Sequence, residues 1–345
     1  MTIMTRALRA AALGAVACGV AFSGAQAAPE ERNYILATAS TGGTYYPVGV
    51  AIATLVKVKL QPKQKIGMSA INSAGSGANV KLIRDGEAQF AIVQGLFGDF
   101  AWNGTGPVEA DGKQTHLRSV SMLWPNVEQF IIRSSAVDTG TVSDLVALKG
   151  KGVSASMGRK NSGTIGSNRT LLDGLGVDVD NDFDLVFVGY GPSAEALQNG
   201  QIDAMNTPSG PPTSAVTQAF AALGDDIALL EFTDEQIAAA NADVSGSLWT
   251  EYVIPAGTYP GVDKDIRTVA QPNFLATHED VDEDAVYQIT KTLYENLGFL
   301  NNIHKATKAM SLDAALAGLP VPLHPGAVKY YKEAGVDIPA NLMAK

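Results

Sequence analysis

Cysteine is nearly absent from this sequence: among 345 residues the only one is Cys18. Cys18 lies in an N-terminal segment that has the features of a secretory signal, so we expect the mature chain to contain no thiol. A chain without thiols has no cysteine nucleophile, no thiolate ligand for a metal and no disulfide bond. These three kinds of chemistry are therefore excluded.

The sequence also lacks the usual motifs of catalysis and nucleotide binding. Its four histidines show no H-x-x-x-H spacing, which argues against a metal centre. No G-x-S-x-G elbow, S-x-x-K motif or G-x-x-x-x-G-K-[ST] phosphate loop occurs. We therefore expect a protein that is not an enzyme and needs no cofactor. An exported hydrolase on an α/β scaffold is the alternative, although no nucleophile stands beside a credible base.

Positive charge is in deficit. The chain has 25 basic and 35 acidic residues, for a formal net charge of −10. Nucleic-acid binding needs a basic face, so we expect no nucleic-acid partner. Apolar residues make up 46% of the chain and charged residues 17%, which is typical of a globular protein. Outside the N-terminal segment no stretch approaches the ~20 apolar residues of a membrane span, so no stable membrane insertion of the mature chain is expected.

The N-terminal segment has the pattern of a signal peptide. Two arginines precede an apolar, alanine-rich run over residues 10–22, and Ala25-Gln26-Ala27 matches the A-x-A cleavage pattern. The apolar run is too short to span a bilayer. We predict a signal peptide over residues 1–27 and a periplasmic mature protein, with a lipoprotein signal ending at Cys18 as the less favoured alternative.

Downstream of the signal, short apolar runs alternate with amphipathic segments. The runs "NYILATA", "KIGMSAI" and "AQFAIVQG" are predicted strands, and the segments between them carry apolar residues at helical spacing. Alternation of this kind predicts a parallel sheet with helices on both faces. A second series with the same pattern begins near residue 126, so we predict two α/β lobes.

The chain is predicted to cross between the lobes twice, near residues 118–127 and again near residues 266–277. The first lobe then holds residues 28–122 and 272–345, and the second holds residues 123–271. Each crossover is expected to act as a hinge.

Two features of the C-terminal part are specific enough to test. Residues 280–300 are predicted as one helix, with an aspartate at the start and apolar residues along one face. His324 precedes Pro325, and we predict that it caps the following helix or packs against it.

Five loops that precede predicted helices are rich in small, hydrogen-bonding residues. In an open parallel sheet such loops lie at the carboxyl ends of the strands, where ligands bind. Their backbone N–H groups and the helix dipole favour an anion. One such loop alone is more often an ordinary helix cap, but two in each lobe facing one cleft favour a polar clamp for a small anion. The loops are "STGGTYYP", "NSAGSGAN", "GRKNSGT", "GYGPSAE" and "NTPSGPPTS".

The first loop does not suit a nucleotide. Tyr45 and Tyr46 would crowd a pyrophosphate, and no acidic residue follows about twenty positions later to hold a ribose. The tyrosines suit a wall against a small organic acid, and Tyr45 is the one expected in the pocket, as a phenol donor. Arg159 could pair with a carboxylate, and Gln94 could supply an amide contact. Hydroxyl groups that could add donors belong to Thr41, Thr44, Ser76, Ser162 and Thr164.

Five segments, taken together and in order, resemble the TAXI family of solute receptors, which serve TRAP-type (tripartite ATP-independent periplasmic) transporters. The resemblance covers nearly the whole mature chain, so it is specific at the level of the family. The segments are "ATASTGGTYYPVG", "NSAGSGANVKLIRDGEAQFAIVQ", "GRKNSGTIGSNRTLLDGLG", "IPAGTYPG" and "PLHPGAVKYYKEAGVDIP".

The resemblance implies a two-lobed periplasmic binding protein fold of the type II-like class, each lobe a mostly parallel sheet flanked by helices. Such a receptor closes on its solute and delivers it to the permease subunits of a TRAP-type transporter. A small anionic solute is implied, with glutamate or a dicarboxylate such as 2-oxoglutarate as candidates. A receptor that feeds a membrane sensor would bind in the same way and stays open as an alternative.

The resemblance also implies positions that contact the ligand. The pair Arg159-Lys160 departs from the more Ser/Gly-rich version expected for the family, which allows a ligand with more negative charge. Pro208, Ser209 and Gly210 match the family less securely than the others do. The remaining matched positions are Gly42, Gly43, Thr44, Tyr45, Ser73, Ser76, Ser162, Gly163 and Thr164.

Overall fold

The computed structural model describes residues 30–242, 244 and 248–344 of the chain. Residues 31–345 form one compact unit. The predicted signal peptide over residues 1–27, with Cys18, lies outside the described residues.

The first sheet has six strands in the order β10-β11-β3-β1-β2, with β4 paired to β11. Strand β1 runs parallel to β2 and β3, whereas β11 is antiparallel to β3, β4 and β10. The sheet is therefore parallel at one side and antiparallel where the long strands join it. The strands are Arg32–Ala37 (β1), Ile66–Ile71 (β2), Phe90–Gln94 (β3), Leu117–Val127 (β4), Thr250–Ile254 (β10) and Ile266–His278 (β11).

The second sheet has five strands in the order β7-β6-β8-β5-β9. Strand β6 is parallel to β7 and β8, and β5 is antiparallel to β8 and β9. The strands are Phe130–Arg133 (β5), Ser154–Ser156 (β6), Asp184–Leu185 (β7), Ala204–Asn206 (β8) and Ile227–Leu229 (β9).

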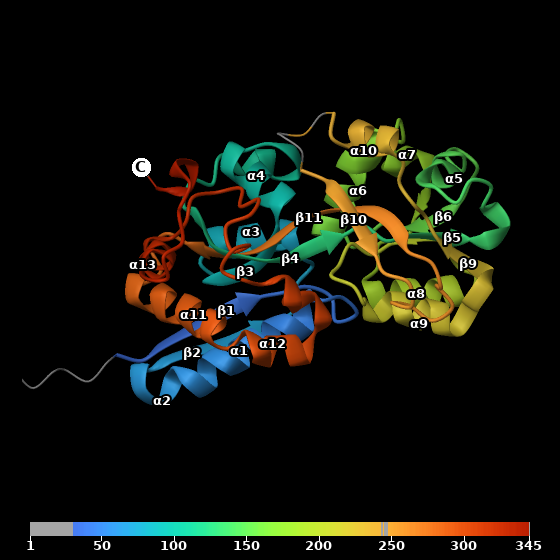
Figure 1. Cartoon of the computed structure of the whole chain (residues 1–345). Helices are drawn as coiled ribbons and strands as arrows, with labels where there is room; N and C mark the ends of the chain where they lie inside the picture. Colours follow the sequence, from blue (N-terminus) through green and yellow to red (C-terminus); the bar gives the residue numbers. More distant parts are fainter. Residues whose placement is uncertain (1–29, 243, 245–247, 345) are drawn as a thin grey trace, which may run out of the picture. The chain divides into compact units, whose positions relative to one another are not determined.

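Helices flank both sheets, which confirms the predicted α/β fold class (Figure 1). The prediction that each sheet is mostly parallel is wrong, because β11 and β5 pair with their neighbours in antiparallel orientation. Those of the first lobe are Tyr45–Lys59 (α1), Gln61–Gln64 (α2), Ser76–Arg84 (α3), Gly95–Asn103 (α4), Glu283–Glu295 (α11), Leu297–Ile303 (α12) and Pro325–Glu333 (α13). Those of the second are Val142–Val146 (α5), Gly163–Asp173 (α6), Val179–Asp182 (α7), Tyr190–Gln198 (α8), Ser214–Leu223 (α9) and Asp234–Ala240 (α10). Short 3₁₀ turns cover Gly106–Asp111, Ser134–Ala136, Gly224–Asp226, Lys305–Ala309 and Ala340–Leu342.

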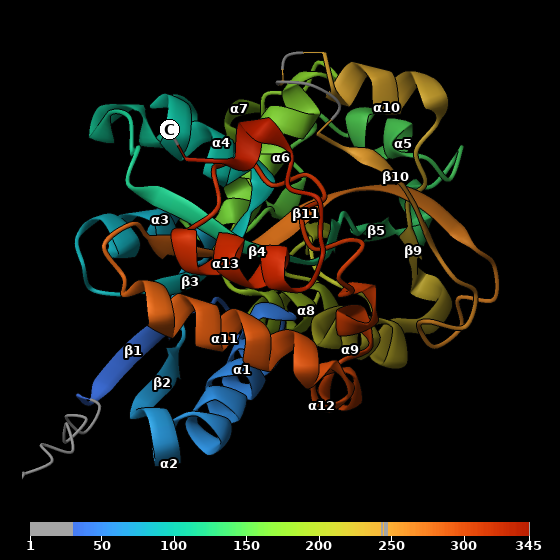
Figure 2. The ribbon, with the colours of Figure 1, turned by 60° about the vertical axis from the view of Figure 1, so that its left-hand side comes forward.

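The C-terminal helices show both a wrong and a confirmed prediction. The single helix expected over residues 280–300 is divided, because Asn296 has φ −130° and ψ 29°, outside the helical region, and separates α11 from α12. His324 caps α13 as predicted: its Nδ1 accepts a hydrogen bond from the Gly326 N–H at 3.1 Å. Figure 2 shows α11 and α13 side by side, where they cover the first sheet.

The long strands β4 and β11 join the two lobes. The central part of β11, with Phe274 and Leu275, belongs to the apolar core of the first lobe. Val269 and Ile266, nearer its start, pack into the apolar clusters of the second. The lobe boundaries predicted after residues 122 and 271 fall inside β4 and β11, and they stay predictions.

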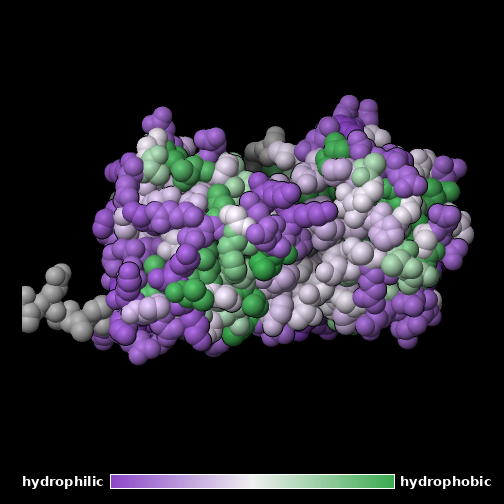
Figure 3. Space-filling view, turned by 60° about the horizontal axis from the view of Figure 1, so that its bottom comes forward, coloured by the Kyte–Doolittle hydropathy of each residue, from purple (hydrophilic) through white to green (hydrophobic). Residues whose placement is uncertain are grey.

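Few large apolar side chains are exposed in the described part of the chain. Figure 3 shows one face, hydrophilic around most of its rim and with apolar residues scattered between polar ones. Exposed apolar residues of this kind are normal on the surface of a folded protein. The exposed ones in the described part of the chain include Val50, Val58, Ile71, Val253, Phe299, Ile303 and Met343.

Candidate functional site

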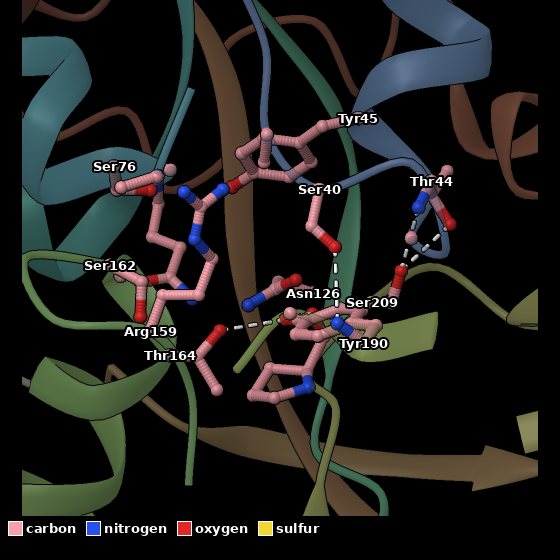
Figure 4. Close-up of a pocket in the computed structure, with 18 of the residues that line it drawn as sticks. Ser40, Thr44, Tyr45, Ser76, Asn126, Arg159, Ser162, Thr164, Tyr190 and Ser209 are labelled. Atoms are coloured by element: carbon pink, nitrogen blue, oxygen red, sulfur yellow. Dashed lines mark hydrogen bonds between the residues drawn. The ribbon is translucent and has the colours of Figure 1, made fainter. Parts of the chain in front are cut away.

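A cavity of about 30 Å³ lies between the two lobes, at the ends of the strands and the beginnings of several helices. Residues of the first lobe and residues of the second line it together (Figure 4). The lining consists of Ala39, Ser40, Gly43, Thr44, Tyr45, Ala74, Gly75, Ser76, Gln94, Asn126, Arg159, Ser162, Gly163, Thr164, Val188, Gly189, Tyr190, Pro208 and Ser209.

Four helices begin at this cavity. The first residues of α1, α3, α6 and α8 are Tyr45, Ser76, Gly163 and Tyr190, and all four line the cavity. The N–H groups of a helix's first turn have no acceptor within the helix, and the dipole places partial positive charge there. Two of the helix starts come from each lobe. The cavity is therefore electropositive on both sides.

Arg159 carries the one formal charge among the residues that line the cavity. All of these lining residues lie in the described part of the chain, and none of them is a carboxylate. Its side chain is exposed at the cavity rim, and its Nη1 donates to the Ser73 carbonyl oxygen of the other lobe at 3.1 Å. A guanidinium in this position can also pair with a carboxylate.

The structure brings most of the predicted site residues to the cavity. Four of them lie outside its lining, namely Thr41, Gly42, Ser73 and Gly210. Ser73 instead holds the loop before α3, because its Oγ donates to Thr38 O at 2.9 Å and accepts from Gly75 N at 2.9 Å. That these residues contact a ligand remains a prediction. Those in the lining are Gly43, Thr44, Tyr45, Ser76, Gln94, Arg159, Ser162, Gly163, Thr164, Pro208 and Ser209.

Several predicted hydroxyl groups are already engaged by the protein. Ser162 caps α6, its Oγ accepting from Ile165 N at 3.1 Å, and the Oγ of Ser76 accepts from Gln94 N at 3.0 Å. The Oγ1 of Thr44 donates to Gly210 O at 2.7 Å. These hydroxyls therefore fix the loops and the contact between the lobes.

Tyr45 lies in the cavity wall, where it was expected. Its hydroxyl donates to Asn273 Oδ1 on β11, and its ring meets Trp124 edge-on with centroids 6.0 Å apart. Burial raises the pKa of Tyr45 well above its usual value of 10. The phenol is neutral and remains a hydrogen-bond donor.

Sequence reasoning missed three polar residues of the lining: Ser40, Asn126 and Tyr190. The Tyr190 hydroxyl lies 2.8 Å from Thr164 Oγ1 and donates to Pro208 O at 2.7 Å, while its backbone N–H donates to Ser40 Oγ at 3.1 Å. Burial raises the pKa of Tyr190 above its usual range. Tyr190 lies in the loop "GYGPSAE" and Ser40 in "STGGTYYP", so both belong to loops that the sequence pattern predicts to bind a ligand. Asn126 lies on a strand, and the sequence pattern gives no signal for it.

The two lobes meet closely around the cavity. A Cβ on Gly42 would lie 2.7 Å from Gly191 N, and one on Gly77 would lie 2.6 Å from Asn161 O. Contacts this short leave no room for a side chain, so the glycines permit the approach. The two lobes are therefore in close contact beside the cavity.

Among the residues the structure describes, no group of three or more His, Cys, Asp or Glu side chains could hold a metal ion. Within that same part of the chain, no helix is both long enough and apolar enough to cross a bilayer.

Comparison with known proteins gives a family and a fold. The model of the NMT1-like family matches residues 36–335. MatC (Rpa3494) from Rhodopseudomonas palustris with bound malate is similar, with TM-score 0.52 and 15% identity over 88% of this chain and 97% of that chain. The periplasmic binding protein BugD has TM-score 0.52 and 14% identity over 89% of this chain and 99% of its own. At these identities the likeness concerns the fold, and it confirms the predicted two-lobed architecture.

Proposed function

Because this chain belongs to the NMT1-like family and folds like periplasmic binding proteins, we propose that it is an extracytoplasmic solute receptor. It binds a small anionic organic solute by closing its two lobes and delivers the solute to a membrane transporter. The export signal predicted over residues 1–27 supports a periplasmic location.

One observation carries the anionic assignment: four helix starts and Arg159 surround a cavity whose lining has no carboxylate among the described residues. Each helix start favours a negative group by about 0.3–1 kcal/mol, and more where the group is partly buried. Charge-assisted hydrogen bonds from N–H groups and guanidinium add to this in a cleft from which water is excluded. A cation would gain neither contribution, and a neutral sugar would gain less than an anion because it carries no negative charge.

The residues that line the cavity favour a protein that binds its solute without reacting with it. Serine and threonine hydroxyl groups line the cavity and could act as nucleophiles. The described lining residues include no histidine and no carboxylate that could take a proton from these hydroxyl groups. Burial raises the pKa values of Tyr45 and Tyr190, so both phenols stay protonated and cannot take up a proton. An exported hydrolase needs a base beside its nucleophile, so we propose a receptor that releases its solute unchanged.

The finer assignment rests on the TAXI resemblance. We propose glutamate or a dicarboxylate as the solute and the permease subunits of a TRAP-type transporter as the partner. MatC, which shares the fold, carries malate, a dicarboxylate. A receptor that reports to a membrane sensor is the second candidate, and a pull-down with the closed, solute-loaded protein separates the two partners.

A thermal-shift screen tests the proposal. A ligand at 100 times its Kd stabilises the folded state by about 2.7 kcal/mol, which raises the melting temperature by several degrees. We expect such shifts with glutamate or dicarboxylates and none with neutral sugars or divalent cations. Stabilisation by sugars or metals alone would contradict the anionic assignment.

A further inference from the structure

One side of the cavity is formed by carboxamide side chains on strands. Asn126 on β4 and Gln94 at the end of β3 line the cavity. Strand β11 places Gln271 opposite Asn126 and Asn273 opposite Gln94. Opposite residues of an antiparallel pair share one face of the sheet, and so do residues two apart on a strand. These four residues, the crossover amides, therefore lie on one face.

The crossover amides hold buried polar atoms that the protein leaves unpaired. Asn126 is 0% exposed, and within the described part of the chain neither its Oδ1 nor its Nδ2 has a hydrogen-bond partner. The Oε1 of Gln94, which is 3% exposed, lacks a partner in the same sense. Burying such atoms without partners costs free energy, and native proteins rarely do so. Figure 4 shows the Asn126 amide in the middle of the labelled side chains.

Turning the amide of Asn126 around does not remove its need for hydrogen-bond partners. The Oε1 of Gln271 accepts from the backbone N–H of Leu96 at 3.0 Å, which fixes that side chain. Whichever way the Asn126 amide is turned, it presents an NH2 group that donates and a carbonyl oxygen that accepts. Pairing both ends of the amide therefore requires an acceptor and a donor.

We propose that Asn126 and Gln94, the two crossover amides that line the cavity, recognise a hydrogen-bond donor on the solute and that Asn126 determines this specificity. The inference rests on the proposed function of an anion receptor. A carboxylate has acceptor oxygens only, so it can pair with the Asn126 N–H group but not with its oxygen. The helix starts and Arg159 already supply donors for the carboxylate. The receptor therefore prefers acids that carry a hydroxyl or ammonium group to acids that carry neither.

A trapped water is the competing partner for these atoms. The cavity volume of about 30 Å³ is enough for water, and a water can both donate and accept. Such a water would serve every acid equally, so it predicts no preference for a donor on the solute. The two accounts thus differ in a measurable ratio of affinities.

Calorimetry with matched acids tests the proposal on the unaltered protein. Succinate, malate and aspartate differ only in a hydrogen, hydroxyl or ammonium at one carbon, and glutarate, 2-hydroxyglutarate and glutamate form a second series. In the series that binds, we expect the hydroxyl or ammonium member to bind at least about tenfold more tightly than the unsubstituted acid. Equal affinities would overturn the inference and leave the anion receptor standing. No binding by any of the six acids would overturn the proposed function, and the inference with it.

A variant of Asn126 tests whether this residue causes the preference for acids that carry a hydrogen-bond donor. Asn126→Leu replaces an unpaired amide by an apolar side chain of similar size, and we expect the affinity ratio to fall to within about twofold of one. A ratio that stays at its original value would overturn the role of Asn126. Asn241→Leu is the control, because that amide bonds to Ile237 O and Trp249 O outside the cavity lining. It should lower the melting temperature without changing the ratio.

Discussion

Thr44 and Ser209 are hydrogen-bonded to each other across the boundary between the lobes. Their hydroxyl oxygens lie 2.9 Å apart, and the Thr44 backbone N–H donates to Ser209 Oγ at 3.0 Å. Thr44 precedes α1 of the first lobe, and Ser209 follows β8 of the second. The pair can exist only when the lobes are closed.

Ser209→Ala removes both hydrogen bonds to Thr44 from the closed state alone. We expect solute affinity to fall at least about five- to tenfold, since each lost hydrogen bond costs roughly 1 kcal/mol. Isothermal titration calorimetry measures the affinity, and small-angle scattering should show a larger radius of gyration for the free variant. Ser214→Ala, at an exposed serine that begins α9, is the matched control and should change neither. A Ser209 variant that also changed neither would show that the pair does not hold the lobes together.

Gly163→Ala tests whether α6 must approach the first lobe for binding. A Cβ on Gly163 would lie 2.4 Å from Gln94 Oε1 and 2.8 Å from Ser76 Oγ. The side chains of Gln94 and Ser76 would have to shift before the lobes could close over a solute, so we expect affinity to fall at least about tenfold. The open form should keep its stability, because alanine suits a helix better than glycine. In Gly191→Ala the new Cβ meets nothing within 4 Å, and calorimetry should find binding unchanged. Similar affinities for the two variants would refute the closed geometry as the binding form.

Arg159→Gln and Lys160→Gln form a matched pair of neighbouring charge removals. Arg159 lines the cavity, whereas Lys160 does not, and its Nζ lies 5.1 Å from the centroid of the Phe187 ring. We expect the Arg159 variant to lose about tenfold in affinity for a dicarboxylate, as an ion pair at a partly exposed site allows. Its affinity should also depend less on salt. Equal losses in both variants would point to a general charge effect and remove Arg159 from the site.

Glu128 gives the protein a pH-dependent stability. This carboxyl group is 1% exposed, and burial raises its pKa from 4.5 to about 7, although its Oε2 accepts from Asn206 Nδ2 at 2.6 Å. The folded state therefore holds the proton more tightly than the unfolded chain. The contribution of Glu128 to stability falls as pH rises from about 4.5 to about 7 and is constant above that.

Melting temperatures of the wild type and Glu128→Gln between pH 5 and pH 8 test this. The variant does not titrate there, so its melting temperature relative to the wild type should rise with pH and level off above about pH 7. Burial lowers the pKa of three histidines, which makes stability rise with pH in both proteins, so their effect cancels in the difference; they are His116, His304 and His324. A difference that does not vary with pH would contradict the buried, protonated carboxyl group.

The loops of the site could be predicted because their chemistry is local. A helix start needs small residues and hydroxyl groups to satisfy its first N–H groups, and these stand next to each other in the sequence. Ser162 and Thr164 were found this way, and both line the cavity. Tyr45 was chosen over Tyr46 and is the one in the cavity wall.

Asn126 could not be found because its environment is not local. It lies on a strand among apolar residues, and it faces the cavity only through the pairing of β4 with β11, which brings Gln271 beside it across the sheet. The break at Asn296 was missed for a related reason, since the apolar pattern continues through it. Periodicity shows which face of a segment is buried, but not where tertiary contacts interrupt it.

Native mass spectrometry of the protein purified without added ligand tests the central claim most directly. The account predicts a bound organic acid that is released on collisional activation and identified by its mass, and a lower occupancy in Gly163→Ala. A neutral sugar or a metal ion as the bound species, or an acid retained equally by that variant, would contradict an anion held between the closed lobes.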